Sequence, residues 1–208
     1  MISGILLAAG ESSRMEGAFK PLLAWGSGTV IDACVKSLRD SRLGQIIVVL
    51  GHREAEIRSR LAGSGVEFAI NPDYKLGMLS SVKTALSQIG PQTTAVLIAL
   101  VDQPMVTAEI INQLIDAYEK GDKRVGLPTY EGRHGHPIIL SRDFEEEIMR
   151  LEDLSPEGLR TLINGHRDEI LEVPVNSAAV IDDIDRPEDY ERLSKQVEPI
   201  YASRKWHP

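Results

Sequence analysis

The sequence predicts an α/β fold: a doubly wound, mostly parallel sheet with a Rossmann-like first half. Short apolar runs alternate with amphipathic segments along the chain, which is typical of repeated βα units. The length of 208 residues favours one large domain with a full core. No internal repeat or Gly/Ser-rich linker divides the chain, so we expect one domain over residues 1–195 and a tail over residues 196–208.

The first half supplies most of the expected strands. Continuous apolar runs predict strands at residues 3–7, 45–50, 66–70 and 95–100. Helical spacing of apolar residues predicts helices at residues 30–39, 54–61 and 79–88. Turn residues separate these segments, as in the 73–77 stretch and at Gly90 and Pro91.

The second half is less regular. Thr107 is a suitable N-cap for a helix that runs to Gly121. Two strands are expected, at residues 124–127 and 137–140, on either side of a polar loop. Two more helices are expected at residues 155–163, where Ser155 and Pro156 resemble a helix start, and at residues 187–193.

Composition narrows the classes of partner. The chain has 31 acidic and 23 basic residues and a formal charge of −8, which disfavours binding to nucleic acid or a membrane surface. No run approaches the roughly 20 apolar residues that span a bilayer. Cys34 is the one cysteine and is expected to be a buried thiol. We therefore expect a cytoplasmic protein in which an anionic ligand meets a local positive site.

The loop after the first strand, residues 7–20, is a candidate phosphate site. Its small residues leave backbone N–H groups accessible, and Arg14 and Lys20 add two cations. It is not a P-loop, because Gly10 and Gly17 have the wrong spacing, and it lacks the G-x-G-x-x-G pattern of dinucleotide sites. On these residues alone, an ordinary glycine-containing turn is an equal alternative.

A second candidate site lies at the end of the strand expected at residues 95–100. Asp102 follows this apolar run, and ligands of open α/β sheets collect beyond the carboxyl ends of strands. A carboxylate there can bind Mg²⁺ against phosphate groups. The alternative is a helix-capping aspartate, but Thr107 already serves as the cap, so a metal role is favoured.

The loop resembles the signature of nucleotidyltransferases that activate sugars, isoprenoid precursors and the molybdenum cofactor. The matching residues are Leu7, Ala8, Ala9, Gly10, Ser12, Arg14, Met15, Gly17 and Lys20. Glu16 departs from the pattern, because many relatives have Gly directly after Met. The resemblance implies a fold of the nucleotide-diphospho-sugar transferase type, a nucleotide bound along the loop, and a triphosphate held by Gly10, Arg14 and Lys20. It also makes Asp102 a metal ligand and, with Arg14 and Lys20, a catalytic residue.

Two further segments resemble the molybdenum cofactor branch of this MobA-like family. The turn at residues 71–81 is similar to a nucleoside-contacting turn, with Asn71, Gly77, Ser80 and Ser81 as the matching residues. The later segments are a Gly-x-x-Gly-His-Pro loop, which includes Gly135 and His136, and an Asp-Ile-Asp ending in which Arg186 replaces the usual Thr. The resemblance implies that the loop receives the acceptor substrate.

Histidine and aspartate pairs in these segments have simpler interpretations as well. His134 and His136 lack a third zinc ligand, so we assign them to the acceptor loop. An acidic turn that caps the last helix would explain at least one of Asp182, Asp183 and Asp185. Strand-like alternation directs Asp183 and Asp185 to the same side, which makes this pair the candidate for the second metal position.

The resemblance implies transfer of CMP from CTP to the phosphate of a molybdopterin-type substrate, with a molybdenum hydroxylase as a possible recipient. The choice of CTP rests on Ala9: the resemblance places this loop position beside the nucleobase, where the cytosine-using branch tends to have Ala and the guanine-using branch Gly. A Cβ there would take space that a purine needs. Two enzyme alternatives are a sugar-phosphate or other small-phosphate transferase and a guanylyltransferase. The third alternative is a noncatalytic carrier of the molybdenum cofactor. The presence of Arg14, Lys20 and Asp102 disfavours it, because a carrier has no need of metal-binding and triphosphate-binding groups together.

Overall fold

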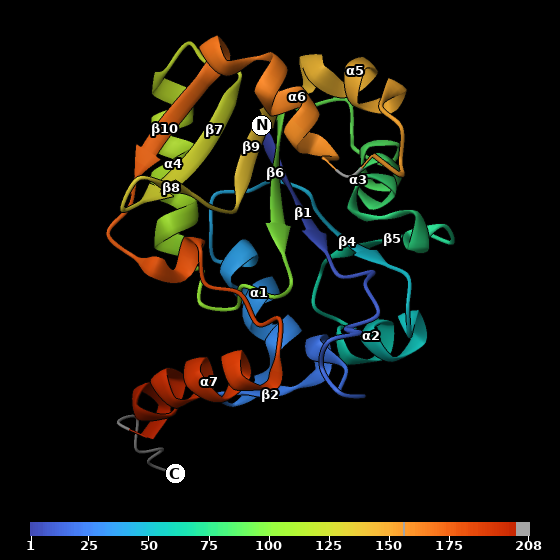
Figure 1. The fold of residues 1–208 in the computed structure, drawn as a ribbon, viewed down its shortest axis with the longest axis vertical. Helices are drawn as coiled ribbons and strands as arrows, with labels where there is room; N and C mark the ends of the chain where they lie inside the picture. The colour runs from blue at the N-terminus through green and yellow to red at the C-terminus, as the bar shows by residue number, and fades with distance from the viewer. Residues whose placement is uncertain (156, 203–208) are drawn as a thin grey trace.

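A mixed, mostly parallel sheet forms the centre of the computed structural model, which describes residues 1–155 and 157–202 (Figure 1). Seven strands follow one another in the order β10, β7, β9, β6, β1, β4, β5, and β8 (Arg133–His134) pairs with β7. Within this order β9 runs antiparallel to β6 and β7. The predicted fold class is confirmed. The bounds are β1 Ile2–Leu7, β4 Ile46–Leu50, β5 Glu67–Ile70, β6 Ala95–Leu100, β7 Val125–Tyr130, β9 Ile138–Ser141 and β10 Ile170–Pro174.

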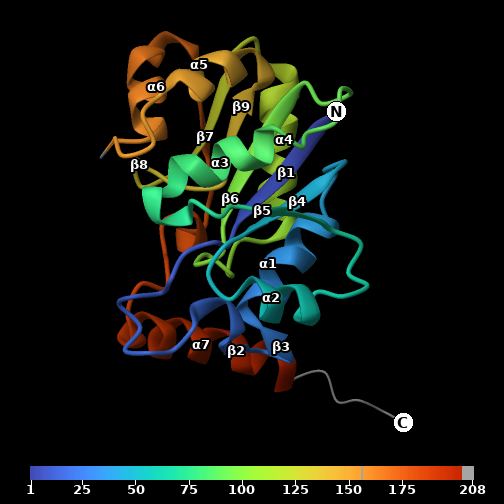
Figure 2. The ribbon, with the colours of Figure 1, turned by 90° about the vertical axis from the view of Figure 1, so that its right-hand side faces the viewer.

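Helices cover both faces of the sheet (Figure 2). Leu6 and Val48 point toward the first helical layer, whereas their chain neighbours Ile5 and Val49 point toward the second. Because both faces are buried, the central strands are continuous apolar runs without polar alternation. The first layer is α1 Val30–Arg39, α2 Glu54–Arg60 and α4 Ala108–Lys120, and the second is α3 Met78–Leu86, α5 Glu145–Arg150 and α6 Leu159–Gly165.

A smaller apolar cluster lies beyond the carboxyl ends of the central strands. Helix α7 (Pro187–Ala202) and the hairpin of β2 (Ala24–Trp25) and β3 (Gly28–Thr29) lie at this end of the molecule (Figure 2). The Tyr190 hydroxyl donates to the Ala24 carbonyl at 2.8 Å. This packing brings the C-terminal helix against the loop that follows β1. The cluster comprises Met15, Trp25, Val30, Ile184, Leu193 and Val197.

Predicted element positions in the first half are confirmed to within two residues. The second half differs more. Helix α6 begins at Leu159, after Gly158 with a φ of 49°, so Ser155 does not start it; Pro156 lies outside the described residues. Strand β10 was not predicted, because it is an edge strand in which Val173 alone is buried, so it lacks a continuous apolar run.

Helix α7 ends later than predicted. It runs to Ala202 and buries Val197, four residues after the buried Leu193, so helical spacing continues into the segment expected to be a tail. Residues 203–208 of that segment lie outside the described residues. Across the described part of the chain, no helix is both long enough and apolar enough to cross a bilayer.

Candidate active site

The carboxyl ends of β1 and β6 border a cavity of about 300 Å³, the first cavity. Eight residues expected at the nucleotide site line it: Leu7, Ala9, Gly10, Ser12, Lys20, Gly77, Ser81 and Asp102. Ala8 is the exception within the Leu-Ala-Ala-Gly stretch, since its side chain packs into the core. The structure therefore brings the loop after β1, the start of α3 and the end of β6 around one space.

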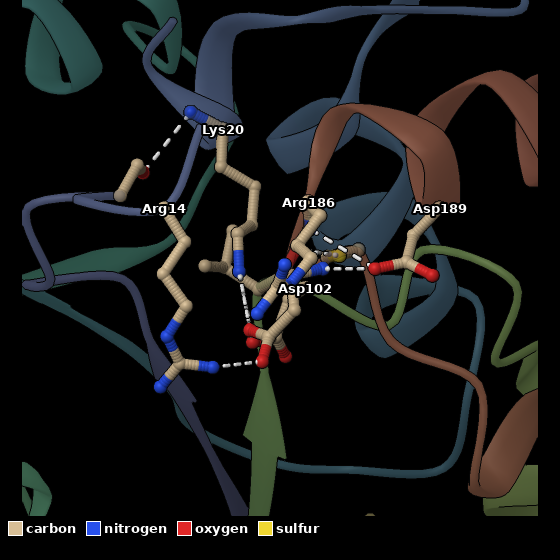
Figure 3. Close-up of polar contacts among 9 residues, drawn as sticks. Arg14, Lys20, Asp102, Arg186 and Asp189 are labelled. Carbon is tan, nitrogen blue, oxygen red and sulfur yellow. Dashed lines mark hydrogen bonds and ion pairs between the residues drawn. The ribbon is translucent and has the colours of Figure 1, made fainter. Parts of the chain in front are cut away.

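The loop after β1 has a backbone suited to approach by a ligand. Ser12, Glu16 and Gly17 adopt positive φ angles of 55°, 50° and 92°, which are typical of tight turns. The Ser12 hydroxyl accepts a hydrogen bond from the Lys20 backbone N–H at 3.1 Å and closes the loop (Figure 3). A Cβ on Gly10 would meet no protein atom within 4 Å, so the space beside this backbone is free for a ligand.

Two cations from this loop meet carboxylates from two distant segments (Figure 3). Lys20 Nζ donates to Asp102 Oδ2 at 3.2 Å and to Asp185 Oδ1 at 3.4 Å, and its side chain is only 10% exposed. Arg14 forms an ion pair with Asp185, and its side chain is 65% exposed. Lys20 thus lies inside the site, whereas Arg14 lies at its rim.

Negative charge exceeds positive charge at this position. Burial, together with the negative charges of Asp185 and Asp102, raises the pKa of Asp183 above its usual value. Asp102 Oδ1 is buried and has no hydrogen-bond partner among the described residues. Three carboxylates against two cations, with one carboxylate oxygen unpartnered, suit a divalent cation. Side chains in the described ranges do not already form a group of three metal-binding residues, so ligation requires rearrangement around Lys20.

Asp182 differs from the two aspartates that follow it. It forms a hydrogen bond with Arg192 of α7 at 3.3 Å. Asp185 instead contacts Lys20 and Arg14. Asp182 therefore pairs with a side chain within the last helix and not with the backbone N–H groups that a helix cap binds, so the capping role stays a prediction.

The turn at residues 71–81 is held by a buried amide. Asn71 Nδ2 donates to the hydroxyls of Ser80 and Ser81 at 2.9 Å each, and its Oδ1 accepts from the Asp73 N–H at 2.9 Å. Ser80 also donates to the Gly77 carbonyl at 2.8 Å. Asn71 and Ser80 lie behind the wall of the first cavity, so two of the four residues predicted in this turn, Gly77 and Ser81, reach the cavity.

A second cavity of about 750 Å³ adjoins the first, and Gly77 and Met78 line both. Gly135 and His136 lie on its wall, as does His134. Burial lowers the pKa of His136 below its usual value, so this imidazole is neutral at pH 7. His134 forms a hydrogen bond with Glu172 at 2.7 Å. The two histidines therefore have different surroundings.

Among the residues of the site that were not expected from the sequence are Tyr74, Met78 and Gln103. Tyr74 and Met78 line the first cavity, and the Tyr74 ring packs on Gly51, where a Cβ would lie 2.7 Å from the nearest ring atoms. Gln103, next to Asp102, is buried and donates to the Val180 carbonyl. Their proximity to Gly77 and Asp102 along the chain was the available signal, but side-chain direction in a turn does not follow from spacing.

Comparison with known proteins identifies the family to which this arrangement belongs. A model of the MobA-like NTP transferase domain matches residues 4–170, which span the loop after β1, Asp102 and the second cavity. The chain belongs to the MobA-like NTP transferase family. It is 32% identical over 190 residues to the molybdenum cofactor cytidylyltransferase of Escherichia coli (strain K12), a match that covers 91% of the chain and 93% of that enzyme.

Solved structures that match almost the whole chain share its fold. The homologue of Mycobacterium tuberculosis Rv0371c from Mycobacterium sp. strain JC1 is 30% identical with a TM-score of 0.84, over 96% of this chain and 98% of that one. Rv0371c of Mycobacterium tuberculosis H37Rv in complex with manganese is 28% identical with a TM-score of 0.78, over 93% and 97% of the two chains. The chain is thus a member of a nucleotidyltransferase family along almost its whole length.

Proposed function

We propose that this family member is a Mg²⁺-dependent cytidylyltransferase that transfers CMP from CTP to the phosphate of molybdenum-molybdopterin and releases pyrophosphate. The observation that carries the proposal is the junction of two cavities at Gly77 and Met78, with Lys20 and Asp102 in the first of them. A donor and an acceptor that occupy adjoining spaces can react directly. The similarity to the Escherichia coli cytidylyltransferase supports this choice of substrates.

The reaction needs alignment and charge neutralisation more than a base. An anionic phosphate oxygen of the acceptor attacks the α-phosphorus of CTP; the new P–O bond forms as the bond to the bridging oxygen of pyrophosphate breaks. Lys20 and Arg14 compensate charge on the triphosphate, and the free backbone beside Gly10 admits it. Asp102, with Asp183 and Asp185, would hold the Mg²⁺. When bound, Mg²⁺ neutralises phosphate charge and polarises the phosphorus.

The residues that line the first cavity favour a pyrimidine base over a purine. Ala9 lines the cavity and is 5% exposed, and its carbonyl accepts from the His52 N–H at 3.0 Å, so its position is set by the segment that follows β4. The Tyr74 ring lies on the same cavity and is held against Gly51. A methyl group and a fixed ring narrow the space for a base. We therefore propose CTP as the donor in preference to GTP.

The second cavity supports an acceptor of considerable size. Its volume of about 750 Å³ falls in the range of pockets that enclose organic ligands. His136 and Arg160 on its wall can donate to anionic groups, and Leu154 and Met78 are exposed apolar side chains beside them. A molybdenum hydroxylase would then receive the product. The buried thiol of Cys34, the one cysteine in the chain, suits a reducing cytoplasmic compartment.

One assay tests the proposal against its alternatives. The protein is incubated with Mg²⁺, one nucleoside triphosphate at a time, and either molybdenum-molybdopterin or a sugar 1-phosphate, and pyrophosphate is measured. Release with CTP and molybdenum-molybdopterin is expected. Release with the sugar phosphate would favour that class of transferase, and release with GTP would favour a guanylyltransferase. Tight binding of the cofactor without pyrophosphate release from any nucleotide would favour a noncatalytic carrier.

A further inference from the structure

We propose that Gln103 is a positioning residue that fixes the loop of the second cavity, residues 134–137, relative to the Asp102 carboxylate through the carbonyl of Val180. The loop supplies His136 to the second cavity, and Asp102 lines the first. The kinetic part of this inference rests on the proposed function. The structural part stands on contacts within the chain.

The Val180 carbonyl is a junction between two segments of the site. It accepts a hydrogen bond from the His136 backbone N–H at 2.8 Å and one from Gln103 Nε2 at 3.3 Å. Val180 is fully buried and Gln103 is 7% exposed, so water does not replace either bond readily. The loop of the second cavity and Gln103, the residue after Asp102, therefore both donate a hydrogen bond to the same carbonyl oxygen.

Gly135 allows the carbonyl to approach the loop. A Cβ at this position would lie 2.0 Å from the Val180 oxygen and 2.6 Å from its carbonyl carbon, distances that no contact tolerates. The Gly135 N–H also donates to the Pro128 carbonyl at 2.9 Å. The φ of Gly135 is not in the left-handed region, so backbone conformation does not require glycine here. Glycine is required because the backbones of Gly135 and Val180 pack closely together.

The same segment returns to Asp102 a few residues later. The Ile184 N–H donates to the backbone carbonyl of Asp102 at 2.8 Å. The stretch from Val180 to Ile184 is thus bonded at both ends to the Asp102–Gln103 pair, and Asp183 lies within it. A shift of the loop of the second cavity would therefore move Val180 and, with it, the carboxylates of Asp183 and Asp102.

A simple core role does not explain the amide of Gln103. Its Oε1 is buried and has no hydrogen-bond partner within residues 1–155 and 157–202, which is an unfavourable state for a polar atom. An apolar side chain of similar length would fill the space without that cost. The bond from Nε2 to Val180 is the contribution that an apolar side chain would lack.

Gln103→Met tests the proposal, because it keeps the length and removes the donor. Gln113→Met is the matched control, since Gln113 Nε2 also donates to a backbone carbonyl, that of Pro174 at 2.9 Å, on an exposed surface. We expect the His136 amide to exchange hydrogen about tenfold faster in Gln103→Met and at the wild-type rate in the control. If Gln103→Met does not fold, the measurement is made in Gln103→Glu.

Kinetics and a double mutant complete the test. For Gln103→Met we expect kcat/KM for the acceptor to fall about tenfold or more while KM for CTP stays unchanged. Gly135→Ala should act on the same junction, so its effect combined with Gln103→Met should be less than additive. Wild-type exchange of His136, equal losses toward both substrates, or full additivity would each overturn the proposal. If the wild type itself releases no pyrophosphate, the proposed function fails, and hydrogen exchange still decides the role of Gln103.

Discussion

Lys20 Nζ lies 3.2 Å from Asp102 Oδ2, so a cation expected to bind the triphosphate and a carboxylate expected to bind the metal neutralise each other. Both side chains are less than a quarter exposed. A metal–nucleotide complex carries charges of both signs. Its phosphates can pair with Lys20 while its metal ion pairs with Asp102. Binding then exchanges one set of ion pairs for another without leaving a buried charge uncompensated.

Asp102→Ala should abolish pyrophosphate release while the fold is retained, because it removes a carboxylate beyond the end of β6 and no part of the core. Lys20 keeps Asp185 as a partner in this variant. Turnover is measured at saturating Mg²⁺, and thermal unfolding is followed by circular dichroism. Unchanged pyrophosphate release would refute the assignment of Asp102 as a metal ligand.

Asp183→Asn and Asp185→Asn should each weaken binding of Mn²⁺, used as a probe for Mg²⁺, by about tenfold or more, because carboxylate number and charge set affinity for hard cations. Asp182→Asn is the control, since Asp182 pairs with Arg192. Titration calorimetry in the presence of CTP measures the affinities. Equal effects of all three substitutions would mean that the segment acts only through its net charge.

Lys20→Ala and Arg14→Ala should each lower kcat/KM by the equivalent of about 2–4 kcal/mol, the usual scale for one preorganised charge contact. The more buried Lys20 should be at the upper end of this range and the exposed Arg14 at the lower end. Lys36→Ala on the surface of α1, where Lys36 pairs with Asp40, is the control. If both site variants keep wild-type kinetics, the loop is structural and a carrier function is favoured.

CTP should be preferred to GTP by roughly ten- to a few hundred-fold in kcat/KM, because exclusion by one methyl group is worth about 1–3 kcal/mol. Ala9→Gly should reduce this preference. Competition between the two nucleotides in one reaction measures it directly. A higher kcat/KM for GTP in the wild type would show that Ala9 does not exclude a purine.

Stability should fall at mildly acidic pH because of His136. Its pKa is lowered in the folded state by burial and by Arg160, with Asp102 opposing, so the unfolded chain binds the proton more readily. The stabilisation is complete above the unfolded pKa of about 6.5 and is lost as pH falls from there toward the lowered folded pKa. Tm measured between these limits should fall less in His136→Asn than in the wild type. The same slope in both proteins would contradict this origin.

The fold class and the main parts of the candidate site were predictable from local sequence. Continuous apolar runs such as β6 require a sheet that is covered on both faces, and Asp102 follows that run directly, at the edge where ligands of such sheets bind. The small residues and two cations after β1 indicated a candidate phosphate loop, with an ordinary turn as the equal alternative on those residues alone. Both signals were accessible because each one lies within a few residues of the chain.

Tertiary structure alone decided which side chains reach the cavity and which charges meet. Asp185 contacts Lys20 across 165 residues of chain, because the segment before α7 crosses the carboxyl ends of β1 and β6. Asn71 and Ser80 matched a motif for nucleoside contact but turn inward to bond each other. Spacing along the chain specifies periodic elements, whose side chains alternate regularly. It does not specify the side-chain directions in loops, which depend on the loops packed against them.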